Sequence, residues 1–200
     1  MSAQGSFGIL AAALAGIACA AAILVPRRGV VIPALLLQFV CTAMLLTPLP
    51  TALAIAYAAV GACVCGILGV TVGGAEALQG PAPVVVPSGL AFRLAAVLLV
   101  GLASAALSRQ ILGAQTGMGM GGSLGAGLLF GLGLLHVGLS EEPLRVGAGL
   151  LSMLGGFQIG YASVEPSVAL QGLLIALPLL IALVVAYLIT LSPGRPESRP

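Results

Sequence analysis

Nearly the whole chain consists of long apolar stretches separated by short breaks, and this feature limits what it can fold into. A helix needs roughly 20 mainly apolar residues to cross a bilayer. In the hydrocarbon core every backbone amide must be bonded within its own segment, so such stretches form helices. Seven stretches are long enough or nearly so, and we predict a membrane span in each. They are 7–25, 30–48, 52–72, 90–108, 123–140, 146–162 and 168–191.

The composition supports this assignment and excludes several classes of protein. Hydrophobic residues make up 60% of the 200 residues and charged residues only 6%, with a mean hydropathy of +1.23. A soluble domain is about a quarter charged, so cytosolic enzymes and nucleic-acid binders are excluded. The chain has no Lys and no Asp, which excludes a Schiff-base pigment protein and an aspartyl-phosphate enzyme. We therefore predict an all-α integral membrane protein with seven transmembrane helices, in contact with membrane lipids and with no nucleic-acid partner.

The arginines predict how the chain is oriented in the cell membrane. Cytoplasmic segments carry an excess of Arg and Lys. With the N-terminus outside and the C-terminus in the cytoplasm, only Arg109 lies outside. The arginines predicted to be cytoplasmic are Arg27, Arg28, Arg93, Arg145, Arg195 and Arg199.

Two parts of the chain share a layout of turns and helices. Each has a helix, an Arg-bearing turn after a proline, a helix containing a Gln and a third helix that begins after a second proline. One connector helix between them gives both units the same orientation, as in the parallel repeats of some transporters. The predicted parts are a first three-helix unit at 1–72, a cytoplasmic loop, connector helix and outer Gly/Met loop at 73–122, a second three-helix unit at 123–191, and a disordered cytoplasmic tail at 192–200.

Few polar side chains fall within the predicted spans. Gln38 and Gln158 could form hydrogen bonds between helices or line a hydrated path, and the hydrogen bond is the preferred interpretation. Gln171 is a weaker member of the same set. His136 is the one ionisable side chain other than Cys and Tyr placed well inside a span, where such groups are often functional. Its place near the end of that span, beside Glu141 and Glu142, favours an interfacial histidine instead.

Other patterns carry no chemistry. Cys63 and Cys65 point about 200° apart on a helix and cannot bind one metal ion together. Gly117, Gly119 and Gly122 match a dinucleotide-binding pattern but lack the preceding strand that it requires. One His and turn-located Glu residues cannot form a nucleophile and base with an orienting acid. We therefore expect no metal, no cofactor and no catalytic residue, and a role that is not enzymatic.

Residues 123–191 resemble the small three-helix K-type subunit (chain 4L) of NADH-quinone oxidoreductase. They are equally similar to the C subunit of the multi-subunit Mrp sodium/proton antiporters and to the E subunit of membrane-bound hydrogenases. The resemblance is carried by Gly131-Leu132-Gly133-Leu134-Leu135 and by Glu142-Pro143-Leu144-Arg145-Val146-Gly147-Ala148-Gly149-Leu150-Leu151. The family has an Arg-bearing cytoplasmic turn followed by a Gly four residues later, the positions of Arg145 and Gly149. Residues 7–72 resemble a weaker second copy, and seven helices suit the longer E-type subunit.

One departure from the family matters for function. The family carries a membrane-embedded Glu two residues after that Gly, where this chain has Leu151. The resemblance thus implies a subunit of a complex I-like, hydrogenase-like or Mrp-like ion-translocating assembly, packed beside antiporter-like subunits, without its own membrane-embedded acid. Two alternatives stay open: a self-contained transporter or channel for a small solute, and a structural or assembly subunit of another energy-converting membrane complex.

Overall fold

The computed structural model describes residues 3–25, 27–46, 50–79, 89–113, 119–164 and 167–191. Within these ranges the chain forms helices and no strand. The helices are α1 (Ala3–Leu24), α2 (Arg28–Leu45), α3 (Thr51–Gln79), α4 (Leu90–Gly113), α5 (Met120–Gly138), α6 (Pro143–Val164) and α7 (Val168–Leu191). The prediction of an all-α membrane protein with seven helices is confirmed.

One of the seven predicted spans is less apolar than the rest. By length and composition, six of the described helices can cross a membrane, and α6 is not among them. Its Arg145, Ser152 and Gln158, together with several glycines, lower its hydropathy below that of its neighbours. It nevertheless has 22 residues, which at about 1.5 Å per residue matches the length of the helices around it.

Three predicted boundaries are corrected by the structure. We predicted that a loop begins at residue 73, but α3 continues to Gln79 because Ala, Glu, Leu and Gln are good helix formers. We predicted that the outer loop begins at residue 109, but α4 continues to Gly113. The second span was predicted to reach residue 48, whereas α2 ends at Leu45, before the two prolines. The predicted tail at 192–200 and Gly117 of the dinucleotide-like pattern lie outside the described residues.

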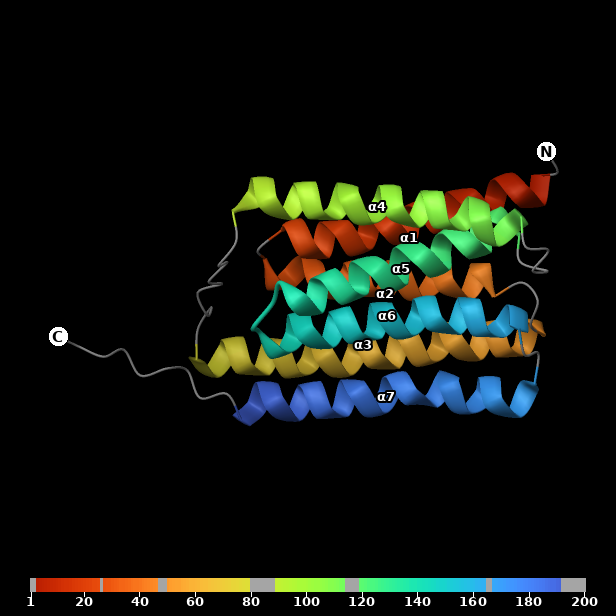
Figure 1. The fold of residues 1–200 in the computed structure, drawn as a ribbon. Coiled ribbons are helices and arrows are strands. Elements are labelled where there is room, and N and C mark those ends of the chain that lie inside the picture. Colours follow the sequence, from red (N-terminus) through yellow and green to blue (C-terminus); the bar gives the residue numbers. More distant parts are fainter. Residues whose placement is uncertain are drawn as a thin grey trace.

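The helices form two rows of three with α4 at one edge. In the first row α2 packs between α1 and α3, and in the second row α6 packs between α5 and α7. Across the rows α1 packs on α5, α2 on α6 and α3 on α7. Counterpart helices run in the same direction, as the predicted parallel repeat requires, whereas the repeat itself stays a prediction. Figure 1 shows all seven helices running side by side, with α4 at the top and α7 at the bottom.

The two ends of the bundle differ in charge. α1 begins at one end and α7 finishes at the other, so the chain crosses the bundle an odd number of times (Figure 1). Arg28, Arg93 and Arg145 lie at the end where α1 finishes, which we call the arginine end. Arg109 is exposed near the other end of α4. The grouping of these arginines is the one expected from the sequence, while the side of the membrane that each end faces stays a prediction.

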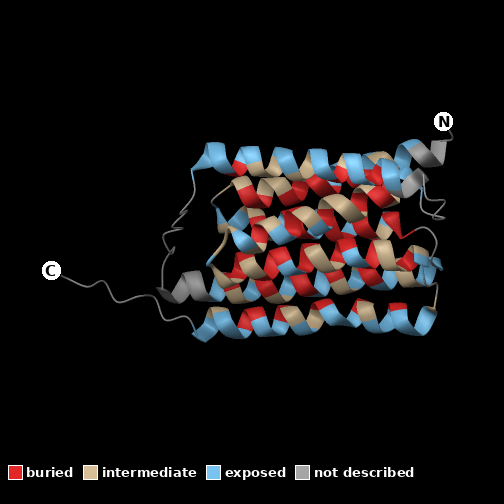
Figure 2. Cartoon of the chain, in the orientation of Figure 1, coloured by how far each residue is buried: buried red, intermediate tan, exposed pale blue. Residues whose placement is uncertain are grey.

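Glycine allows the close packing of α5 on α6. A Cβ atom added at Gly133 would lie 2.5 Å from the Met153 backbone nitrogen, and one at Gly156 would lie 2.5 Å from the Phe130 nitrogen. Without side chains at these positions the two backbones can approach closely, as small residues permit in membrane proteins. Buried residues gather in α1, α2, α5 and α6, whereas α4 and α7 are mostly exposed (Figure 2). The interior that can hold functional groups therefore lies between the two rows.

Candidate functional site

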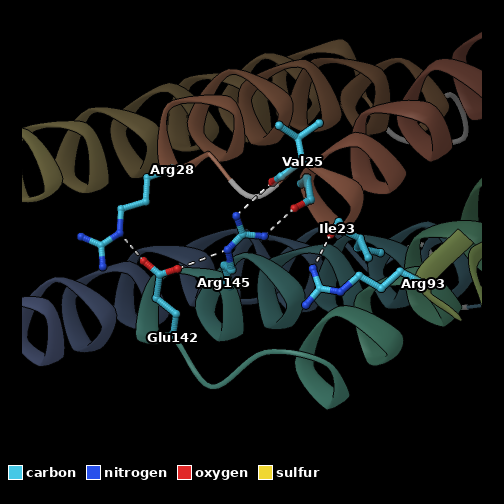
Figure 3. A network of polar contacts seen from close by, with 7 residues as sticks. Ile23, Val25, Arg28, Arg93, Glu142 and Arg145 are labelled. Atoms are coloured by element: carbon cyan, nitrogen blue, oxygen red, sulfur yellow. Dashed lines mark hydrogen bonds and ion pairs between the residues drawn. The ribbon is translucent and has the colours of Figure 1, made fainter. Parts of the chain in front are cut away.

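Two buried arginines close the end of α1. Arg145 donates from Nη1 to the Ala22 carbonyl and from Nη2 to the Val25 carbonyl, both at 3.0 Å. Arg93 donates from Nη1 to the Ile23 carbonyl at 2.9 Å. The last carbonyls of a helix have no partner within the helix, and that end carries a partial negative charge. The two guanidinium groups therefore satisfy and neutralise the end of α1 (Figure 3).

One carboxylate connects this arrangement to α2. Glu142 forms ion pairs with Arg28 and, over 3.2 Å, with Arg145 (Figure 3). Arg145 is only 3% exposed, so its charge depends on these partners. We call Arg28, Arg93, Glu142 and Arg145 the arginine cluster. It joins α1, α2, α4 and α6 at one end of the bundle.

His136 lies inside the bundle rather than at its surface. It is near the end of α5, as expected from the sequence, but its side chain is 1% exposed. Neither Nδ1 nor Nε2 has a hydrogen-bond partner among the described residues. The position of His136 near the end of its helix agrees with the expected interfacial place, and the structure adds that the surrounding protein buries the ring.

A chain of polar groups follows further into the bundle. The Ser152 hydroxyl on α6 lies 3.0 Å from Gln38 Oε1 on α2 and 2.8 Å from the carbonyl of Ala148, one turn earlier on α6. The Cys19 thiol on α1 donates to the same hydroxyl over 3.7 Å. These contacts bring the predicted Gln38 together with two residues from which we expected no such contact.

Two hydroxyl groups, those of Thr42 and Tyr57, lie close to Gly155, about one turn further along α6. A Cβ atom at Gly155 would lie 3.2 Å from the Tyr57 hydroxyl and 3.7 Å from Thr42 Oγ1. Both of these side chains are buried, and the Tyr57 ring packs on Phe39 with a centroid separation of 5.3 Å. Gly155 thus leaves room for two hydroxyl groups between α2, α3 and α6.

Two glutamines continue the series toward the opposite end. Gln158 donates from Nε2 to the Leu174 carbonyl on α7. Gln158 Oε1 and Gln171 Nε2 have no hydrogen-bond partner among the described residues, and both side chains are 1% exposed. Gln158 therefore links α6 to α7, and each of the two side chains keeps one unpartnered polar atom in the interior.

These groups form a polar column between the two rows of helices. From the arginine end inward it comprises His136, Cys19, Gln38, Ser152, Thr42, Tyr57, Gln158 and Gln171. The carboxylate of Glu142 is held in the arginine cluster and is not part of the column. Sequence reasoning found the histidine and the glutamines but missed Ser152, Thr42 and Tyr57. The signal that could have found Ser152 is its spacing of about two helical turns from Arg145, which places both on one face of α6.

Gly149, singled out by the family resemblance, has a packing role in the structure. A Cβ atom there would lie 2.7 Å from Val137 Cγ2 and 2.9 Å from the Gly133 carbonyl oxygen. It therefore belongs to the close α5–α6 contact. Arg145, four residues earlier, reaches across to α1 instead.

Comparisons with protein-family models, curated proteins and solved structures give no match to this chain. Among the described residues, no group of three or more His, Cys, Asp or Glu side chains is placed to hold a metal ion. What the site can do must therefore be argued from its own geometry.

Proposed function

We propose that this chain is an integral membrane subunit of a complex I-like, hydrogenase-like or Mrp-like ion-translocating assembly, packed beside antiporter-like subunits. The observation that carries the proposal is the polar column, which runs between the two rows of helices without a carboxylate among its residues. A proton or cation pump needs a titratable group at depth. A polar interior with no carboxylate among its described residues, and with its one histidine at the arginine end, is suited to support a pathway whose charged groups come from neighbouring subunits.

The arginine cluster and the close α5–α6 contact support this proposal. Arg145 and Gly149 are among the residues that carry the resemblance of the second unit to the K-type subunits. Arg145 fixes the end of α1 to α6, and Gly149 lets α5 approach α6 closely. The features that carry the resemblance therefore serve to hold the helices in a fixed arrangement, as a supporting subunit requires.

Co-purification tests the proposal. The tagged full chain, expressed in its native host and extracted in a mild detergent, is expected to bring down antiporter-like membrane subunits identifiable by mass spectrometry. Gly149→Leu should abolish this assembly by forcing α5 from α6. Gly172→Leu is the matched control, because nothing lies within 4 Å of a Cβ atom at Gly172. A monodisperse chain without such partners, at native expression levels, would contradict the proposal.

A self-contained channel for a small neutral solute is the second candidate. It is favoured by the amide groups of Gln38, Gln158 and Gln171, which line the interior without charge. Purified protein in liposomes would then pass a neutral solute at a rate that depends on Gln38 and Gln158. Absence of flux for a panel of neutral solutes, together with recovery of native partners, would exclude it.

The third candidate is a structural or assembly subunit of another energy-converting complex. Substitution of the glutamines distinguishes it from the other two candidates. In that case Gln38→Leu and Gln158→Leu leave the activity of the complex intact, whereas leucine at Gly133 or Gly156 breaks the complex. Loss of activity from the glutamine substitutions in a fully assembled complex would exclude a purely structural role.

A further inference from the structure

The His136 side chain is buried, yet it has no hydrogen-bond partner among the described residues. A histidine ring has two nitrogens, and in the neutral form one donates and the other accepts. Both nitrogens of His136 lack a partner among the described residues, although the side chain is 1% exposed. Buried polar groups in native proteins are nearly always hydrogen-bonded, to protein or to ordered water.

The surroundings of His136 provide further groups for such a ligand. Arg145 carries two hydrogens on each terminal nitrogen and uses one from each on the carbonyls of Ala22 and Val25. Arg93 donates to the neighbouring Ile23 carbonyl. On α5, one turn before His136, Leu132 packs on Cys19 and Ile23 of α1. The turn of α5 that precedes His136 thus packs on Cys19 and on the same end of α1 that the two arginines close.

The charges around the ring favour a small neutral ligand. A cation would be repelled by the two guanidinium groups, and an anion has no hydrogen to donate to the acceptor nitrogen of a neutral imidazole. Water donates and accepts, and an internal water molecule forms about three hydrogen bonds to otherwise unpartnered buried groups. A water molecule can accept a hydrogen bond from a guanidinium group. It can also accept from the N–H of a neutral imidazole or donate to its other nitrogen.

We propose that His136 is an internal water-binding site that joins the arginine cluster to the hydrogen-bonded group of Cys19, Ser152 and Gln38. The bound water extends the polar column to the arginine end of the bundle. This inference goes beyond the proposed function and does not rest on it, because water binds to this chain whichever partners it has.

The single histidine of the chain allows a direct test. The full chain, labelled with ¹⁵N-histidine and placed in lipid bilayers, gives ring signals from His136 alone. We expect magnetisation transfer from water to the ring N–H, and loss of that signal in D₂O. A ring N–H that shows neither would overturn the proposal.

A second measurement asks whether water reaches the group beyond the histidine. Cys19 is 1% exposed, whereas Cys65 is 6% exposed and its thiol donates to the Ile32 carbonyl, away from the column. Burial alone predicts that the Cys65 thiol exchanges its hydrogen for deuterium first. The proposal predicts the reverse order, with Cys19 faster by roughly tenfold, since hydration opens a local route to exchange.

Infrared S–H stretching bands report this exchange in two variants that retain only Cys19 or only Cys65, with the other cysteines changed to Ala. His136→Phe should slow Cys19 exchange to the Cys65 rate or below. His136→Gln, which keeps a donor and an acceptor, should preserve fast exchange and serves if the Phe variant fails to fold. Slower exchange at Cys19 than at Cys65 in the otherwise unchanged chain would contradict the proposal. So would fast Cys19 exchange that persists in His136→Phe.

Discussion

Arg145 shows how one residue can hold distant parts of a membrane protein together. Its guanidinium group bonds two carbonyls at the end of α1 and the carboxylate of Glu142, which also pairs with Arg28. The planar guanidinium fork suits several fixed acceptors at once, which a lysine ammonium does not. Removal of the side chain would leave two carbonyls and part of a carboxylate without their partner.

Arg145→Met should therefore destabilise the protein by about 3–5 kcal/mol, as expected when one partner of a buried ion pair is removed. The stability of Arg145→Lys should lie between those of the unchanged chain and Arg145→Met, because lysine keeps the charge but lacks the planar guanidinium fork. Thermal unfolding of a fluorescent fusion, followed by size-exclusion chromatography in detergent, measures the effect. Arg109→Met is the control, because Arg109 is exposed at the opposite end. Equal stability of Arg145→Met and Arg109→Met would refute the role assigned to the cluster.

Gln158 makes a weaker contribution at the other end of the column. Its Nε2 donates to the Leu174 carbonyl, and hydrogen bonds between membrane helices are worth on average about 0.6 kcal/mol. Gln158→Leu should thus lower stability only slightly in the same thermal assay. A loss comparable to that of Arg145→Met would mean that Gln158 holds α7 in place by more than this bond.

The contact between α5 and α6 is set by backbone proximity rather than by large side chains. A Cβ atom added at Gly133, Gly149 or Gly156 would lie within 3.0 Å of backbone atoms of the facing helix, α6 or α5. Gly160 lies further along α6, and a Cβ atom there meets nothing within 4 Å. The glycines of α6 therefore differ in whether a side chain can be added at their position without a clash.

Gly156→Ala and Gly160→Ala should have opposite effects. The first places a methyl group against the Phe130 nitrogen and the Ala126 carbonyl, and overpacking of this kind costs about 1–3 kcal/mol. The second should be neutral or stabilise by about 0.5–1 kcal/mol, because alanine restricts the unfolded chain more than glycine does. Parallel thermal unfolding curves compare the two. Destabilisation by Gly160→Ala equal to that by Gly156→Ala would show that the close contact is misplaced.

The helices could be located from the sequence, but their faces could not. Apolar length places all seven, and the predicted span 168–191 has the same bounds as α7. In lipid both the buried and the exposed faces of a helix are apolar, so the pattern does not tell which side turns inward. For the same reason Ser152 gave no sign that it meets Gln38, and nothing local shows that Arg145 reaches the carbonyls of α1. Such contacts depend on how the rows pack.

At the scale of the whole molecule, residues at the two ends of the helix bundle should face opposite sides of the membrane. Arg27 and Gly119 are both exposed, the first at the arginine end and the second at the start of α5. In a chain whose native cysteines are replaced by Ala, Arg27→Cys and Gly119→Cys should be labelled from opposite sides of the membrane. The excess of arginine predicts that residue 27 is labelled from the cytoplasm. Labelling of both from the same side would contradict the arrangement of the helices.

The bond from Arg145 to the Ala22 carbonyl spans 123 positions of the chain, and this separation has a consequence for biogenesis. Domains and their parts emerge from the ribosome in order, N-terminal segments first. Because α1 is synthesised before α6, the Ala22 and Val25 carbonyls lack the Arg145 partner until α6 is inserted beside them. A nascent chain arrested after α5 would therefore hold α1 with Arg93 but without Arg145 at its end, and the carbonyls left open would turn to water or to lipid headgroups.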